Sequence, residues 1–276
     1  MTLAVRLCTE DPEAVKLHRT VLSSLPRSFR VDGQQLDVAL LSGRDLDWAA
    51  RARSALRVGA RGALLAAPWA ASSSAVREVA EDARRAAVPI VVDRAYGADP
   101  VWIGVLDRLR ADLPSCALLE SVVSVRERGL TPTAHLRAGL VEQLAAVEEL
   151  LGECEFVPVQ RGEHQYLART HRGGLLVELV GVGSPAANDR LALDLVGVER
   201  RWSARFSGEV LARPTVVTAH HVEGCHEEAL QFESSHRRCW QQLYDAVDQE
   251  RTEDGLDQLV RRLSLASAVL AEMPVP

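Results

Sequence analysis

Lysine is nearly absent from this chain of 276 residues. Its 32 basic residues comprise Lys16 and 31 arginines. We interpret this bias as the codon usage of a GC-rich genome rather than as a functional signal. The bias still has a chemical consequence, because only one position of the chain can supply a catalytic lysine.

Long apolar runs are also absent. No stretch of about 18 apolar residues occurs, so we expect no membrane-spanning helix. The first 13 residues lack a basic segment followed by an apolar core, which argues against a secretion signal. Five cysteines are scattered without a repeated spacing, and this odd, dispersed set favours reduced thiols. Together these features predict a cytoplasmic protein.

An excess of basic charge is missing as well. The formal net charge is −6 and the isoelectric point is about 5.8. Binding to the phosphates of nucleic acid requires a basic surface, so nucleic acid is not an expected partner. The apolar fraction of 47% is ample for the core of one large domain or two smaller ones.

Strands and helices are expected to alternate in the first part of the chain. Asp11 and Asp99 each precede a proline, which is typical of an N-cap followed by the first helical residue. The predicted strands are residues 3–8, 36–42, 62–67 and 89–93, with a remnant edge strand at 29–31. The predicted helices begin at residues 11, 45, 72 and 99. This alternation indicates a parallel sheet covered on both faces.

After residue 115 the pattern changes. A strand at 117–125 and a helix at 134–151 precede successive strands at 155–160, 165–171, 174–181, 190–197 and 200–208, and two closing helices at about 234–249 and 253–272. Trp202, Ala204 and Phe206 alternate with Arg201 and Arg205, which is typical of an antiparallel strand with one solvated face.

These patterns predict two domains. Residues 1–114 form a trimmed, Rossmann-like α/β domain with a parallel sheet. Residues 115–276 form an α+β domain with an open, mainly antiparallel sheet and closing C-terminal helices.

Glycine is missing where a dinucleotide site needs it. Such a site has glycines directly after the first strand, so that the backbone can approach the pyrophosphate at a helix N-terminus. Here the first glycine is Gly33, and residues 8–13, Cys-Thr-Glu-Asp-Pro-Glu, occupy the place of that loop. The three carboxylates complement the helix dipole themselves and would repel a phosphate. Asp32 is interpreted as a turn residue before Gly33 rather than as a ribose-binding acid.

Three segments, in this order, resemble the Gfo/Idh/MocA oxidoreductase family. Residues 55–102 resemble the stretch around its Glu-Lys-Pro motif, residues 135–153 its helix that carries an Asp and a His into the site, and residues 234–272 its two closing helices. The resemblance covers most of the chain and implies a Rossmann domain followed by an open-sheet domain. Within the family, residues 190–214 are faintly similar in layout to thiazolinyl imine reductases, which reduce a carrier-bound imine with NADPH.

The resemblance also shows which position of this chain lacks the family's lysine. Ala66-Ala67-Pro68 stands where the family has Glu-Lys-Pro. The family's lysine supports proton transfer, which Ala67 cannot do. Lys16 lies in the first predicted helix and cannot substitute for it. If a cofactor does bind, the resemblance makes Pro68 and Trp69 the residues beside it.

The candidate catalytic residues lie on the helix predicted at 134–151. The resemblance places Glu142 where the family usually has its active-site His, and Ala145 where an Asp is common. Glu142 can act as an acid or base if burial raises its pKa, and the alternative interpretation is a solvated helix glutamate. His135, at the start of the same helix, is the second candidate.

Metal-type ligands are densest in residues 219–228, which hold His220, His221, Cys225 and His226. In a strand over 215–222 the two adjacent histidines point to opposite faces and cannot bind one ion. The Cys-His pair is also adjacent, whereas zinc sites favour spaced pairs. We therefore expect a polar connection here and no metal site.

Three arginines on one strand are a candidate anion site. Arg200, Arg201 and Arg205 could meet an anionic ligand, although an exposed sheet face explains them more simply.

Two functional hypotheses follow. The preferred one is a degenerate family member without dinucleotide binding or redox catalysis, and so without a cofactor. It would act in bacterial secondary metabolism as a partner subunit, a small-molecule-binding protein or a non-redox enzyme. The alternative is an active NAD(P)H-dependent oxidoreductase, such as an imine reductase. Since the family often pairs its open sheets, the resemblance also implies a homodimer through that sheet or a hetero-oligomer with an active homologue.

Overall fold

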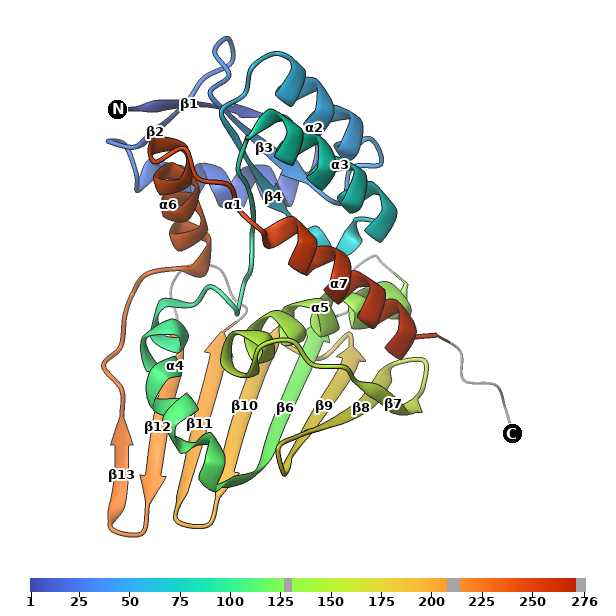
Figure 1. Cartoon of the computed structure of the whole chain (residues 1–276), viewed down its shortest axis with the longest axis vertical. Coiled ribbons are helices and arrows are strands. Elements are labelled where there is room, and N and C mark those ends of the chain that lie inside the picture. Colours follow the sequence, from blue (N-terminus) through green and yellow to red (C-terminus); the bar gives the residue numbers. More distant parts are fainter. Residues whose placement is uncertain (127–130, 208–213, 272–276) are drawn as a thin grey trace. The chain divides into compact units, whose positions relative to one another are not determined.

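The computed structural model describes residues 1–126, 131–207 and 214–271 (Figure 1). The chain divides into two compact units. Unit 1 comprises Met1–Arg94 and Ser235–Leu263, and unit 2 comprises Ala95–Ser234 and Ser264–Pro276. This division differs from the expected boundary between residues 114 and 115, because the helix at Pro100–Asp112 packs within unit 2 and the first closing helix returns to the parallel sheet. Gly208 and Glu272, the predicted ends of two elements, lie outside the described residues.

A parallel sheet of five strands forms the centre of unit 1, in the order β2-β1-β3-β4-β5. The strands are β1 (Leu3–Leu7), β2 (Phe29–Val31), β3 (Val38–Ser42), β4 (Gly62–Ala66) and β5 (Ile90–Val92). The short strand expected at 29–31 is confirmed as edge strand β2. β3, β4 and β5 are buried at every residue, as parallel strands with both faces covered should be.

Helices of unit 1 pack on this sheet as two pairs, α2 with α3 and α1 with α6 (Figure 1). Their bounds are α1 (Pro12–Ser23), α2 (Trp48–Arg57), α3 (Ser73–Ala86) and α6 (Ser235–Asp248), and α7 (Gly255–Val269) begins in this unit. Gly62 lets α6 approach β4 closely, because a Cβ there would lie 2.8 Å from Val247 Cγ2. Ser72, where the sequence predicts this helix to begin, is the N-cap of α3, since its Oγ accepts a hydrogen bond from Ala75 N at 3.2 Å.

Unit 2 contains an eight-stranded sheet in the order β13-β12-β11-β10-β6-β9-β8-β7. The strands are β6 (Cys116–Arg126), β7 (Val157–Arg161), β8 (Gln165–Arg172), β9 (Leu175–Ser184), β10 (Arg190–Gly197), β11 (Arg200–Ser207), β12 (Val216–His221) and β13 (Gly224–Glu227). Among the described strands of this sheet, only β6 and β9 pair in parallel, so the sheet is mixed and mostly antiparallel. Together the two units confirm the predicted fold class.

The interpretation of residues 219–228 as a polar connection was wrong. Residues 224–227 form edge strand β13, which pairs with β12 from Thr218↔Glu227 to His221↔Gly224. All four residues of β13 are exposed. An edge strand of this kind has no buried side, and so it lacks the apolar alternation that reveals a strand in a sequence.

Helices α4 (Pro100–Asp112) and α5 (Pro132–Leu151) cover one face of this sheet (Figure 1). A buried hydrogen bond from Trp102 Nε1 to Ala146 O, 3.2 Å long, joins the two helices. Gln143 of α5 reaches the sheet, where its Nε2 donates to Ser121 O at 2.8 Å and its Oε1 accepts from the Tyr166 hydroxyl at 2.7 Å. Among the described helices, none has the length and apolar character needed to cross a membrane.

Candidate functional site

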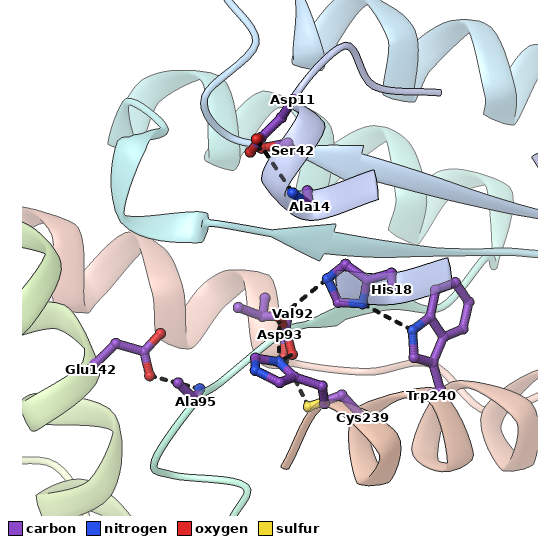
Figure 2. A network of polar contacts seen from close by, with 11 residues as sticks. Asp11, Ala14, His18, Ser42, Val92, Asp93, Ala95, Glu142, Cys239 and Trp240 are labelled. Atoms are coloured by element: carbon purple, nitrogen blue, oxygen red, sulfur yellow. Dashed lines mark hydrogen bonds and ion pairs between the residues drawn. The ribbon is translucent and has the colours of Figure 1, made fainter. Parts of the chain in front are cut away.

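The carboxyl ends of β1, β3 and β4 form the edge at which an open α/β sheet usually binds its ligand. Asp11, three residues after the expected first strand ends, is buried at this edge and caps α1 (Figure 2). Its Oδ1 accepts hydrogen bonds from Glu13 N at 3.0 Å and Ala14 N at 3.3 Å. Its Oδ2 accepts from Ser42 Oγ, at the end of β3, at 2.8 Å. The protein's own carboxylate therefore takes the helix N-terminus that a pyrophosphate would need.

Arg44 extends this polar network across the same edge. Its Nη1 forms an ion pair with Glu13 and lies 3.7 Å from Asp11 Oδ1. Its guanidinium carbon also lies 5.3 Å from the centre of the Trp69 ring, which is a cation–π distance. Trp69 is thus in contact with an arginine of its own unit, and its role beside a cofactor stays a prediction.

The segment from Ala66 to Pro68 makes a tight turn without any polar side chain. Ala66 is the buried last residue of β4, and Ala67 has left-handed backbone angles, with φ of 44° and ψ of 50°. Pro68 is buried and begins the short helix η1 (Pro68–Ala70). Gly43 packs against this turn so closely that a Cβ would lie 2.6 Å from Ala67 O. Ala67, which stands where the family has its lysine, therefore lies in a tight turn that packs against the neighbouring loop.

Glu142 and His135 lie on α5, separated by about two helical turns, or roughly 10 Å along the axis. Glu142 Oε2 accepts hydrogen bonds from Ala95 N at 2.8 Å and Tyr96 N at 3.4 Å (Figure 2). These bonds give Glu142 a structural role, because they fix the backbone that enters unit 2 after β5. His135 is buried. A catalytic role for either residue stays a prediction.

A second polar cluster in unit 1 was not predicted from the sequence. Asp93, the buried residue directly after β5, contacts both His18 of α1 and His236 of α6. Figure 2 shows Asp93 beside His18. His236 Nδ1 lies 2.8 Å and 2.9 Å from the two oxygens of Asp93, and His18 Nε2 lies 3.4 Å from Oδ2. Trp240 Nε1 donates to His18 Nδ1 at 3.1 Å. The four side chains, called the Asp93 cluster below, join α1, β5 and α6.

Hydrogen-bonding chemistry fixes the protons of this cluster. Because an indole N–H can only donate, His18 Nδ1 accepts, and the ring proton of His18 therefore lies on Nε2, toward Asp93. An ionised carboxylate only accepts, so the Nδ1 proton of His236 points at Asp93 as well. Burial alone would raise the pKa of Asp93, but the charge of His236, its hydrogen bond and the nearby ring N–H of His18 hold that pKa far below its usual range.

Metal-type side chains do not converge in the residues that the structure describes. No group of three or more His, Cys, Asp or Glu side chains there could hold a metal ion. In strand β12, His220 pairs with Cys225 and His221 with Gly224 across the ladder.

Comparisons with known proteins place this geometry in a known fold. No protein-family model and no curated protein sequence matches the chain. Among solved structures, a dehydrogenase (MviM) of Clostridium difficile matches with a TM-score of 0.75 and 8% identity, over 97% of this chain and 98% of that one. A dehydrogenase of Chromobacterium violaceum matches with a TM-score of 0.72 and 13% identity, over 97% and 94%.

A third similar structure contains a dinucleotide. The 3-ketoreductase KijD10 of Actinomadura kijaniata, in complex with NADP and TDP-benzene, matches with a TM-score of 0.73 and 15% identity, over 98% of this chain and 96% of that one. At these identities the matches show a shared fold. The expected likeness to the Gfo/Idh/MocA oxidoreductases is therefore confirmed for the fold of the whole chain.

Proposed function

We propose that this protein is a degenerate Gfo/Idh/MocA-like protein that binds no dinucleotide and transfers no hydride. The buried Asp11 carboxylate at the N-terminus of α1 carries this proposal. A pyrophosphate at that position would meet a carboxylate already bonded to the helix N–H groups, together with the charge of Glu13. Two anions about 4 Å apart repel each other strongly in a partly buried site.

The packed turn at Ala66 and Ala67 supports the same proposal. It offers no acid or base next to Pro68, and Gly43 closes on it from the neighbouring loop. A protein with this fold and without redox chemistry acts as a partner subunit, a small-molecule-binding protein or a non-redox enzyme. We place it in bacterial secondary metabolism.

Calorimetric titration of the purified protein with NADPH and NADH tests this proposal. We expect no saturable binding of either cofactor to unit 1 at concentrations up to about 1 mM, which corresponds to a binding free energy weaker than about −4 kcal/mol. The NADP-binding 3-ketoreductase is the positive control, since it shares the fold. Micromolar binding of either cofactor to unit 1 would overturn the proposal.

The alternative function is an NAD(P)H-dependent oxidoreductase, such as an imine reductase. The full-length likeness to an NADP-bound ketoreductase favours it. An imine can take its proton from a group other than lysine, and Glu142 would be that acid. Under this alternative, the titration gives saturable binding, and Glu142→Gln retains cofactor affinity while losing turnover.

The partner is part of the same proposal. We propose that the open face of the eight-stranded sheet associates with a second copy or with an active homologue. Sedimentation velocity of the chain alone, and of the chain mixed with such a homologue, separates the two forms. A chain that stays monomeric in both samples would contradict this part.

A further inference from the structure

A cavity of about 330 Å³ lies within unit 2, bounded by the end of α4 and by strands β11 to β13. Its volume falls in the range of small-molecule sites. The polar side chains that line it are Arg108 and Asp112 of α4, Arg200 of β11, His221 of β12, His226 of β13 and Glu228. Trp202, Ala111 and Ala219 supply apolar lining.

Strand register brings these residues to one face of the sheet. Arg200 pairs with His221, and Trp202 pairs with Ala219. Residues two apart in a strand share a face, so Arg200 and Trp202 point together toward α4. Arg201 and Arg205 point to the other face, where both form ion pairs with Asp194 at 2.8 Å. The three arginines that the sequence suggested as one anion site therefore lie on two faces of the sheet. Of these three, Arg200 alone lines the cavity.

Both carboxylates that line the cavity already accept hydrogen bonds from side chains of this protein. Asp112 accepts from Arg200 Nη1 at 2.7 Å and 3.0 Å, and from Trp202 Nε1 at 2.7 Å. Burial alone would raise the pKa of Asp112, but these hydrogen bonds hold the pKa below its usual range, so Asp112 stays ionised. Glu228 accepts from Arg108 Nη1 at 2.6 Å.

The groups that remain are donors. A guanidinium has five N–H groups, and Arg108 gives only Nη1 to an acceptor in the described part of the chain. Arg200 uses Nη1 and Nε, and its Nη2 meets no acceptor there. Arg200 Nε donates to His221 Nδ1 at 3.0 Å, so the ring proton of His221 lies on Nε2. Arg108, Arg200 and His221 thus all offer N–H groups at one cavity.

We propose that this cavity binds a small molecule through a carboxylate or phosphate group. The anion accepts hydrogen bonds from Arg108, Arg200 and His221, which are charge-assisted and suit its geometry. The apolar part of the ligand lies against Ala111, Ala219 and the edge of Trp202. This site is independent of the proposed loss of dinucleotide binding in unit 1.

The probes are benzoate and phenyl phosphate, with benzamide as the neutral counterpart of benzoate. Binding is followed by the indole 15N–1H resonance of Trp202, assigned with Trp202→Phe, because that N–H lies at the cavity. We expect saturable shifts with at least one anion, a Kd of about 1 mM or below, and none with benzamide. The two anions also distinguish a carboxylate site from a phosphate site.

Neighbouring arginines on one strand give a matched control. Arg200→Gln removes a donor of the cavity, and Arg201→Gln removes an arginine on the opposite face that is likewise paired with an aspartate. We expect Arg200→Gln to weaken anion binding about tenfold or more and Arg201→Gln to leave it unchanged. Arg108→Gln, an exposed position, should also weaken binding if Arg200→Gln does not fold.

Three results would overturn the site: no binding of either anion at about 10 mM, equal binding of benzamide, or equal weakening by Arg201→Gln. NADPH carries phosphates and could enter this cavity. A heat signal with NADPH that disappears in Arg200→Gln belongs to the cavity, whereas one that persists belongs to unit 1. The two proposals therefore fail separately.

Discussion

Asp93 is a single carboxylate that joins three elements of unit 1. It follows β5 and contacts His236 of α6 and His18 of α1. Each histidine is oriented so that a ring N–H faces the carboxylate, and Trp240 fixes the far side of His18. Such a buried charge stabilises a fold only while its partners are present, because an uncompensated charge in the interior is costly.

Replacing Asp93 with Asn should therefore destabilise the protein. We expect the free energy of unfolding near neutral pH to fall by about 3 kcal/mol, because Asn removes the negative charge and turns an NH2 donor toward one of the two ring N–H groups. Urea unfolding followed by circular dichroism measures this loss of unfolding free energy. Glu78→Gln is the control, because Glu78 is exposed and its pairing with Arg53 should contribute at most about 1 kcal/mol.

The same variant predicts a pH dependence. The pKa of Asp93 in the folded state lies far below its value of about 3.9 in an unfolded chain. Its stabilisation is thus complete above about pH 4 and decreases as the pH falls further toward the folded-state pKa. The difference between wild type and Asp93→Asn should shrink in that acid range. A difference that stays constant down to about pH 2 would contradict the assignment.

Helix α1 begins at the buried carboxylate of Asp11. Asp11→Ala removes the acceptor for two backbone N–H groups and for Ser42, and should cost about 2 kcal/mol of stability. Asp11→Asn keeps a capping oxygen and should lose less than half of that. Thermal unfolding of the two variants measures the difference. If Asp11→Ala unfolds at the wild-type temperature, the cap is not what holds this end of α1.

Strand β9 depends on a glycine facing an aromatic ring. A Cβ on Gly181 would overlap the ring of Tyr166 on neighbouring β8, and that ring is fixed by its hydroxyl bond to Gln143. Gly181→Ala should therefore lower the free energy of unfolding by about 2 kcal/mol or more. Gly33→Ala is the control, because no atom lies within 4 Å of its Cβ position. In a double-mutant cycle with Tyr166→Ala, the two losses should be less than additive.

Elements with a local chemical signature could be predicted from the sequence. Asp11 and Asp99 were expected as N-caps, and each accepts backbone hydrogen bonds in the first turn of its helix. Each of these signals lies within a few residues of the chain. Strand β13 gave no signal, because it is exposed throughout and depends on pairing with β12.

The polar sites could be predicted only where they are local. The carboxylates before α1 lie in one short segment, so their effect on a phosphate could be inferred. The Asp93 cluster combines positions 18, 93, 236 and 240, and each side chain alone is unremarkable in the sequence. Only the return of α6 to the parallel sheet brings them together. The cavity lined by Arg200 likewise requires the register of three strands.

At the scale of the whole molecule, unit 1 is discontinuous in sequence. Its core needs α6, whose Leu243 and Val247 lie against the position of Gly62 in β4. Residues 1–94 alone would expose this surface and lose His236, one of the two histidines that contact Asp93. We therefore expect the fragment 1–94 to unfold without a cooperative transition, because so small a sheet with one uncovered face buries too little apolar surface.

Joining the two pieces should restore unit 1. Asp93 and His236 are within hydrogen-bonding distance, so a linker of about three glycines, roughly 10 Å, can connect residue 94 to residue 235. The fusion of 1–94 with 235–263 should give one urea transition and dispersed indole resonances for Trp48, Trp69 and Trp240. The same fusion with Asp93→Asn should unfold at lower urea. Equal stability of the bare fragment 1–94 and the fusion would show that α6 is not part of this folding unit.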